Sequence, residues 1–155
     1  MSANGNMYEI ALDEAWDLFG AYVGGARSAL VCVLSSRPLD DRSRAALNSS
    51  ACALGYGRDA CTFAVVGDNA EDALDDPAVF LMIEGLDPLC LVATDEGAAR
   101  ILGRTYRCDV SLARTSRVFG RSAVAFKSFA DMLDDGQDKQ IAWALLKKLP
   151  RFGNR

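Results

Sequence analysis

Four short apolar runs, separated by segments with helical patterning, constrain the fold of this 155-residue chain more than any other feature. They lie at residues 29–34, 61–66, 89–93 and 122–126. Each run is continuous, as expected of a parallel strand that is buried on both faces. Parallel strands need long crossover connections, which the intervening segments supply. The pattern predicts a single α/β domain over residues 1–155, a three-layer α/β/α sandwich with a four-stranded parallel sheet.

The segments between these runs carry helical spacing and helix-end signals. The first predicted helix lies in residues 7–26 and is ended by Gly24-Gly25, and the third, residues 78–84, is ended by Gly85. The others are residues about 40–54, 94–106 and 138–149. The segment 78–84 is ambiguous, because Asp76 and Pro77 are typical of a helix start, whereas 79–83 is also short and apolar enough for a strand.

The composition excludes several kinds of site. The chain has no His, which removes Ser-His-Asp, Cys-His and His-zinc chemistry. Its five cysteines are scattered without a C-x-x-C pair, so we expect buried free thiols, no metal, no iron–sulfur cluster and no other cofactor. No signal-like segment or run of about 20 apolar residues is present, which predicts a soluble, cytoplasmic protein without membrane association.

The net charge of −4 conceals a split along the chain. Residues 1–99 hold 5 basic and 16 acidic side chains, a local charge of −11, whereas residues 100–155 hold 12 and 5, a local charge of +7. The basic third can bind the phosphates of a nucleic acid or a nucleotide. It can equally pair with the acidic part of the same fold or form a solvated face.

In an open parallel sheet, ligands bind outside the carboxyl ends of the strands, so the loops after the apolar runs are the candidate site. Asp40 and Asp41 are the candidate catalytic groups, as a general acid or base, although helix capping also explains an Asp there. The candidate ligand-binding residues are Ser35, Ser36, Arg37, Pro38, Asn69, Thr94, Lys127, Ser128 and Phe129. Phe129 can stack on a base or serve as a hydrophobic anchor for the turn. For Lys127 and Ser128, the alternative to ligand binding is that they are simply the polar residues at which the strand ends.

Two stretches resemble the uracil-DNA glycosylase superfamily. Residues 86–103 are similar to its proline-preceded apolar strand, short turn, paired alanines and Leu-Gly, and residues 132–149 are similar to its closing helix. The resemblance covers about residues 29–149. It implies a four-stranded parallel sheet between helices and a site for excising a nucleobase from DNA.

The chain departs from the family where the family does its chemistry. The Gly-x-x-Pro-type loop is here Ser35-Ser36-Arg37-Pro38, the uracil-reading asparagine has no clear counterpart because Asn69 comes late, and the His-Pro-Ser loop is Lys127-Ser128-Phe129. The four cluster cysteines of the iron–sulfur branch are also unmatched.

We therefore expect a diverged, non-catalytic relative that binds a nucleic acid, a nucleotide or a protein. The alternatives are an active nucleobase-excising glycosylase that uses Asp40 or Asp41, and an unrelated α/β domain for a small ligand or a protein partner.

Overall fold

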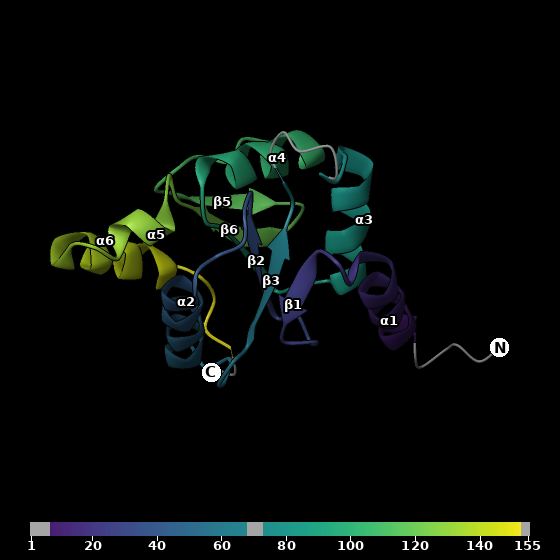
Figure 1. The fold of residues 1–155 in the computed structure, drawn as a ribbon, viewed down its shortest axis with the longest axis horizontal. Helices are drawn as coiled ribbons and strands as arrows, with labels where there is room; N and C mark the ends of the chain where they lie inside the picture. Colours follow the sequence, from purple (N-terminus) through teal and green to yellow (C-terminus); the bar gives the residue numbers. More distant parts are fainter. Residues whose placement is uncertain (1–6, 68–72, 153–155) are drawn as a thin grey trace.

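The computed structural model describes residues 7–67 and 73–152. A central β-sheet lies between two layers of helices, as Figure 1 shows. Strands from residues 23–125 form this sheet, in the order β1-β3-β2-β4-β6-β5. The α/β class and the helices on both faces agree with the sequence prediction.

The four predicted strands form the centre of the sheet. They are β2 (Val31–Ser35), β3 (Cys61–Val65), β4 (Cys90–Ala93) and β6 (Arg121–Ala125), each within two residues of its predicted range. All neighbouring pairs among them are parallel. Their side chains alternate between two cores: Cys32 and Leu34 face one helical layer, and Val31 and Val33 face the other. Burial on both faces explains why these strands appear as continuous apolar runs.

The prediction of a four-stranded, all-parallel sheet is wrong, because two antiparallel edge strands extend the sheet to six. β1 (Val23–Gly25) pairs with β3, and β5 (Thr115–Val118) pairs with β6. β1 occupies part of the predicted opening helix, since α1 covers only Met7–Phe19. Both edge strands are short and largely solvent-accessible, so they carry no continuous apolar run. They adopt the strand conformation because they pair with a neighbouring strand.

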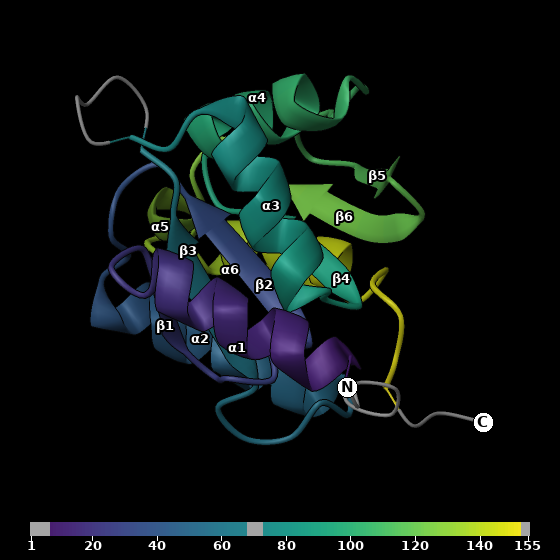
Figure 2. The same ribbon diagram turned by 90° about the vertical axis from the view of Figure 1, so that its right-hand side faces the viewer.

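The helices form two separate layers, one on each face of the sheet. α1, α3 (Asp76–Leu86) and α4 (Glu96–Tyr106) pack against one core; in Figure 2, α1 and α3 lie in front of the sheet and α4 lies above it. α2 (Asp41–Ala53), α5 (Phe129–Met132) and α6 (Gly136–Leu146) pack against the other core. The ambiguous segment 78–84 is thus helical. No helix in the described ranges is long and apolar enough to cross a membrane.

Aspartates set where the helices begin. Asp40 caps α2 as predicted, but α3 is capped by Asp75, α4 by Asp95 and α6 by Asp135, so the predicted starts at Asp76, Thr94 and 138 move by one to three residues. In each case a carboxylate oxygen accepts a backbone N–H three residues on.

Gly85 does not end α3, as the sequence suggested, but lies inside the helix. A Cβ atom at this position would lie 2.9 Å from the Cβ of Ala15, so the glycine permits the close approach of α1 and α3.

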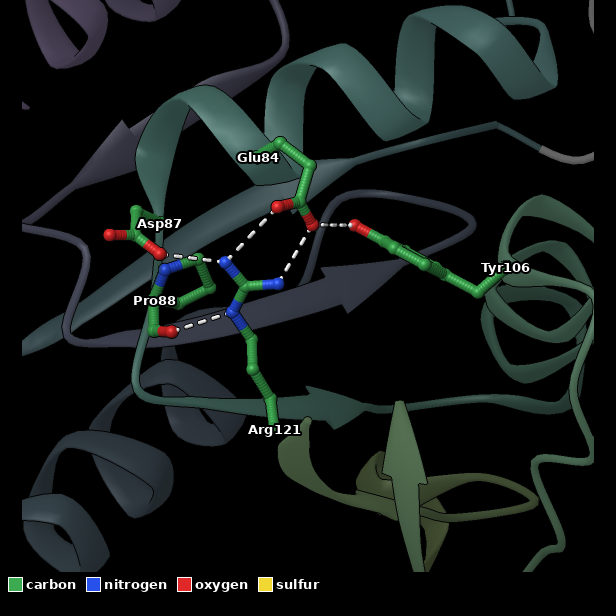
Figure 3. A network of polar contacts seen from close by, with 5 residues as sticks. All are labelled: Glu84, Asp87, Pro88, Tyr106 and Arg121. Atoms are coloured by element: carbon green, nitrogen blue, oxygen red, sulfur yellow. Dashed lines mark hydrogen bonds and ion pairs between the residues drawn. The ribbon is translucent and has the colours of Figure 1, made fainter. Parts of the chain in front are cut away.

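A network around Arg121 holds the amino end of β6 against α3 and α4 (Figure 3). Its guanidinium donates to Glu84 at 2.7 Å, to Asp87 at 2.7 Å and to the Pro88 carbonyl at 2.8 Å, and the Tyr106 hydroxyl donates to Glu84 at 2.6 Å. Burial opposes the charge of Arg121, but the hydrogen bonds to the two carboxylates outweigh it and raise its pKa. The side chain is only 11% exposed, so the network is a structural feature of the amino edge, opposite the candidate site.

Candidate functional site

The structure brings together the candidate residues that follow β2 and β4. Ser35 Oγ and Thr94 Oγ1 lie 2.7 Å apart and form a buried hydroxyl pair. Thr94 Oγ1 also donates to the Leu34 carbonyl at 3.3 Å. Because these hydroxyls are buried and bonded to each other, they join two strands and are not presented to a ligand.

Asp95 is the polar centre of this edge, and it is absent from the predicted site residues. One carboxylate oxygen accepts the Ala98 N–H at 2.8 Å, which caps α4. The other accepts the Ser36 N–H at 3.1 Å and the Ser36 hydroxyl at 2.9 Å. The carboxylate thus joins the loop after β2 to the start of α4. One sequence signal could have identified Asp95 as the cap of this helix, because Asp is preferred over Thr at the N-cap position.

The exit of β6 lies against the same residues. The Lys127 carbonyl accepts the Glu96 N–H at 3.1 Å, and the Thr94 carbonyl accepts the Phe129 N–H at 2.8 Å. Ser128 caps the short helix α5. The Phe129 ring is 2% exposed and packs edge-on against Phe126, with ring centroids 5.1 Å apart, so it occupies the core as an anchor of the turn.

The remaining candidates lie apart from this cluster. Arg37 and Pro38 are exposed in the loop that leads to α2. Asp40 caps that helix, and hydrogen bonding from Ser43, whose N–H lies 2.8 Å from its carboxylate, lowers the pKa of Asp40. Asp41 is exposed in the first helical turn, and Asn69 lies outside the described residues.

A groove of about 730 Å³ opens at the carboxyl end of β6. It runs between the start of α4, the loop at 112–113, α5 and α6. Its floor is apolar, its rim carries charges of both signs, and its lining residues are Glu96, Leu112, Ala113, Phe126, Lys127, Ser128, Asp131, Met132, Ile141, Ala144, Leu145 and Lys148. Lys127 and Ser128 are the two predicted residues among them.

One wall of the groove had a signal in the sequence. Ile141, Ala144, Leu145 and Lys148 recur with helical spacing, which is the pattern of one helix face. The sequence predicts that this helix buries Ile141, Ala142, Leu145 and Leu146. The last three are buried, but Ile141 is 51% exposed. Periodicity identifies a face but does not tell whether another element covers it.

The groove has the size of a small-molecule site, for which volumes of roughly 300–1,000 Å³ are usual. Lys127 and Lys148 are exposed, and neither forms an ion pair within the described ranges. Within residues 7–67 and 73–152, no group of three His, Cys, Asp or Glu side chains is placed to hold a metal ion. The two lysines suit an anionic group on a ligand with an apolar body, and the rim also carries the carboxylates of Glu96 and Asp131.

Comparison with known proteins assigns no family, since neither a family model nor a curated protein sequence matches the chain.

Proposed function

We propose that this chain is a diverged, non-catalytic domain of the uracil-DNA glycosylase type that binds a nucleotide or a single-stranded nucleic acid in the groove at β6. The observation that carries the proposal is the pair of unpaired lysines, Lys127 and Lys148, above an apolar floor at the carboxyl edge of the parallel strands. Four parallel central strands between two helical layers are compatible with the sequence resemblance, whereas the two antiparallel edge strands depart from the four-stranded sheet that it implies.

Each part of such a ligand has a chemical match in the groove. Lysine side chains neutralise phosphates, and an apolar floor accepts the face of a base. Glu96 and Asp131 lie on the rim, where a carboxylate can accept a hydrogen bond from the exocyclic amino group of a base. This favours cytosine, adenine or guanine over uracil and thymine.

The lack of catalysis is supported by what the acids near this edge do. Asp95 uses both carboxylate oxygens in hydrogen bonds, and Asp40 serves as a helix cap. Excision of a base needs positioned donors for the developing charge and a residue that directs water. With no His in the chain, the groove offers neither a proton carrier for neutral pH nor the family's loop after the fourth parallel strand.

Fluorescence anisotropy with a labelled single-stranded oligonucleotide tests the binding. The variant Lys127→Ala, Lys148→Ala should weaken binding at least about tenfold and reduce the slope of log affinity against log salt by about 1.4. Competition by a mononucleotide distinguishes the two ligands, because a true nucleotide site is emptied by the mononucleotide alone.

The matched control is Arg58→Ala, Arg151→Ala. It removes the same charge from two exposed residues at the opposite edge of the sheet. Arg58 precedes β3, and Arg151 precedes Phe152, whose N–H donates to the Leu54 carbonyl after α2. Equal loss in this control would show non-specific charge attraction, and no binding by the wild type would overturn the proposal.

A uracil-release assay tests the non-catalytic part separately. We expect no uracil release from single- or double-stranded substrates. Release by the wild type that is lost in Asp40→Ala, Asp41→Ala would instead support an active glycosylase.

A further inference from the structure

We propose that a second copy of this chain docks on an exposed aromatic face formed by Phe80, Tyr106 and Phe119, through the acidic outer side of α1. The aromatic face lies on the layer of α1, α3 and α4, away from the β6 groove, and the proposal does not depend on the proposed function.

The aromatic face is a packed cluster that remains open to solvent. Phe80 comes from α3, Tyr106 from the end of α4, and Phe119 from the turn between β5 and β6. Their ring centroids lie 5.3 to 6.1 Å apart. Phe80 is 40% exposed and Phe119 69% exposed. Clustered exposed aromatics mark interaction surfaces, unlike isolated exposed apolar residues.

Phe119 is poorly suited to its own turn. Phe119 and Gly120 have φ angles of +51° and +88°, the combination of a two-residue hairpin turn that favours Asn-Gly. A bulky side chain is disfavoured in this left-handed conformation. Turn chemistry does not account for a phenylalanine here. Its ring packs against Phe80 and Tyr106 yet stays 69% exposed, so most of its surface is free for a further contact.

Arginines surround the aromatic face. Arg107 is exposed at the end of α4, and Arg117 donates only to the Gly120 carbonyl and the Ser122 hydroxyl among the interactions of the described residues. Beside Phe80, a hollow of about 480 Å³ is lined by Leu81, Arg107 and the ion pair of Arg104 with Asp76, among others, which leaves Arg107 as its free cation among the lining residues. The surface therefore suits an apolar side chain flanked by carboxylates.

The outer side of α1 has this chemistry. Asp13, Glu14, Asp17 and Leu18 are all exposed, and their spacing places them along one side of the helix. Asp13 is ion-paired with Arg27 of the same chain, so Glu14 and Asp17 are the carboxylates offered to the partner copy. Leu18 is 64% exposed, an apolar side chain between acidic ones. Since α1 belongs to the same helical layer as α3 and α4, which carry Phe80 and Tyr106, two copies related by a two-fold axis can each dock α1 on the other.

Sedimentation velocity of the full chain over a wide concentration range tests this proposal. We expect a reversible dimer that weakens with added salt, because the contact includes charge pairs. Phe119→Asn and Leu18→Lys should each raise the dimer dissociation constant at least about tenfold. Asparagine suits the left-handed turn position, so Phe119→Asn should remain folded. Ile141→Lys, which changes an exposed side chain on the opposite layer, is the control and should leave the dimer intact.

Mixing the two variants gives the sharpest result. In a mixed dimer, the intact α1 of Phe119→Asn meets the intact aromatic face of Leu18→Lys, so mixing should restore part of the association. A monomer at every concentration, a dimer that neither variant weakens, or mixing without recovery would each overturn the proposal.

Discussion

Replacing Arg121 with methionine should be among the most destabilising single substitutions at the amino edge of the sheet. Methionine keeps an apolar stem in a site where the arginine side chain is 11% exposed, but it removes the guanidinium. Glu84, Asp87 and the Pro88 carbonyl then lose the donor that they share.

The cost can be worked from the three acceptors. The charged hydrogen bond to Glu84 is worth about 1.5–3 kcal/mol, and leaving the Pro88 carbonyl unpaired costs about 1–3 kcal/mol. Asp87 is 51% exposed and regains water, so its contribution is below about 1 kcal/mol. Allowing for water entry, we expect a loss of about 3–4 kcal/mol, within the range for breaking a buried ion pair.

Urea denaturation measures this loss directly, and a thermal scan should show Tm lower by about 10 °C. Arg117→Met is the matched control, because Arg117 bonds only to Gly120 and Ser122 on the exposed hairpin and should cost below about 0.5 kcal/mol. Adding Glu84→Gln to Arg121→Met should recover stability, since it removes the unpaired charge. A loss below about 1 kcal/mol, or one equal to that of Arg117→Met, would refute the reasoning.

Two further predictions concern the carboxyl edge and the thiols. Asp95→Ala should lower the free energy of unfolding by about 2 kcal/mol, because it removes the cap of α4 and leaves both Ser36 donors unpaired; a urea titration that shows no more loss than Asp41→Ala would contradict this. With a thiol reagent at mildly alkaline pH, Cys52 should react first, because it is exposed whereas burial raises the pKa of Cys32 and Cys61 to about 12 and that of Cys90 to about 11. Mass spectrometry of the labelled chain checks the order, and equal labelling of Cys52 and Cys90 in the folded protein would be inconsistent with the structure.

The central strands could be predicted from the sequence because burial on both faces leaves a local pattern. Apart from Ser35 and Thr62, the residues of Val31–Ser35 and Cys61–Val65 are apolar whichever face they point to. β1 has no such pattern, since Val23–Gly25 becomes a strand only by pairing with β3 some 40 residues later in the chain. Its glycines were interpreted as the end of a helix, which they closely follow.

The sequence predicted which edge of the sheet carries the candidate site, but not all of the residues that line it. The rule that ligands bind at the carboxyl ends of parallel strands directed attention to Lys127 and Ser128, which line the groove. The opposite wall comes from α6 and the loop at 112–113, whose placement depends on tertiary packing. Side chains such as Thr94 and Phe129 were candidates by position, but the structure buries them.

The most direct test of the proposed function is a heteronuclear NMR titration of isotope-labelled protein with a mononucleotide and, separately, with a short single-stranded oligonucleotide. The account predicts shifts concentrated at the amides of Lys127, Ser128, Asp131 and Lys148 around the groove, with little change near Arg58 and Arg151. Shifts centred on the aromatic face, shifts spread evenly over the basic third of the chain, or no shifts at all would contradict it.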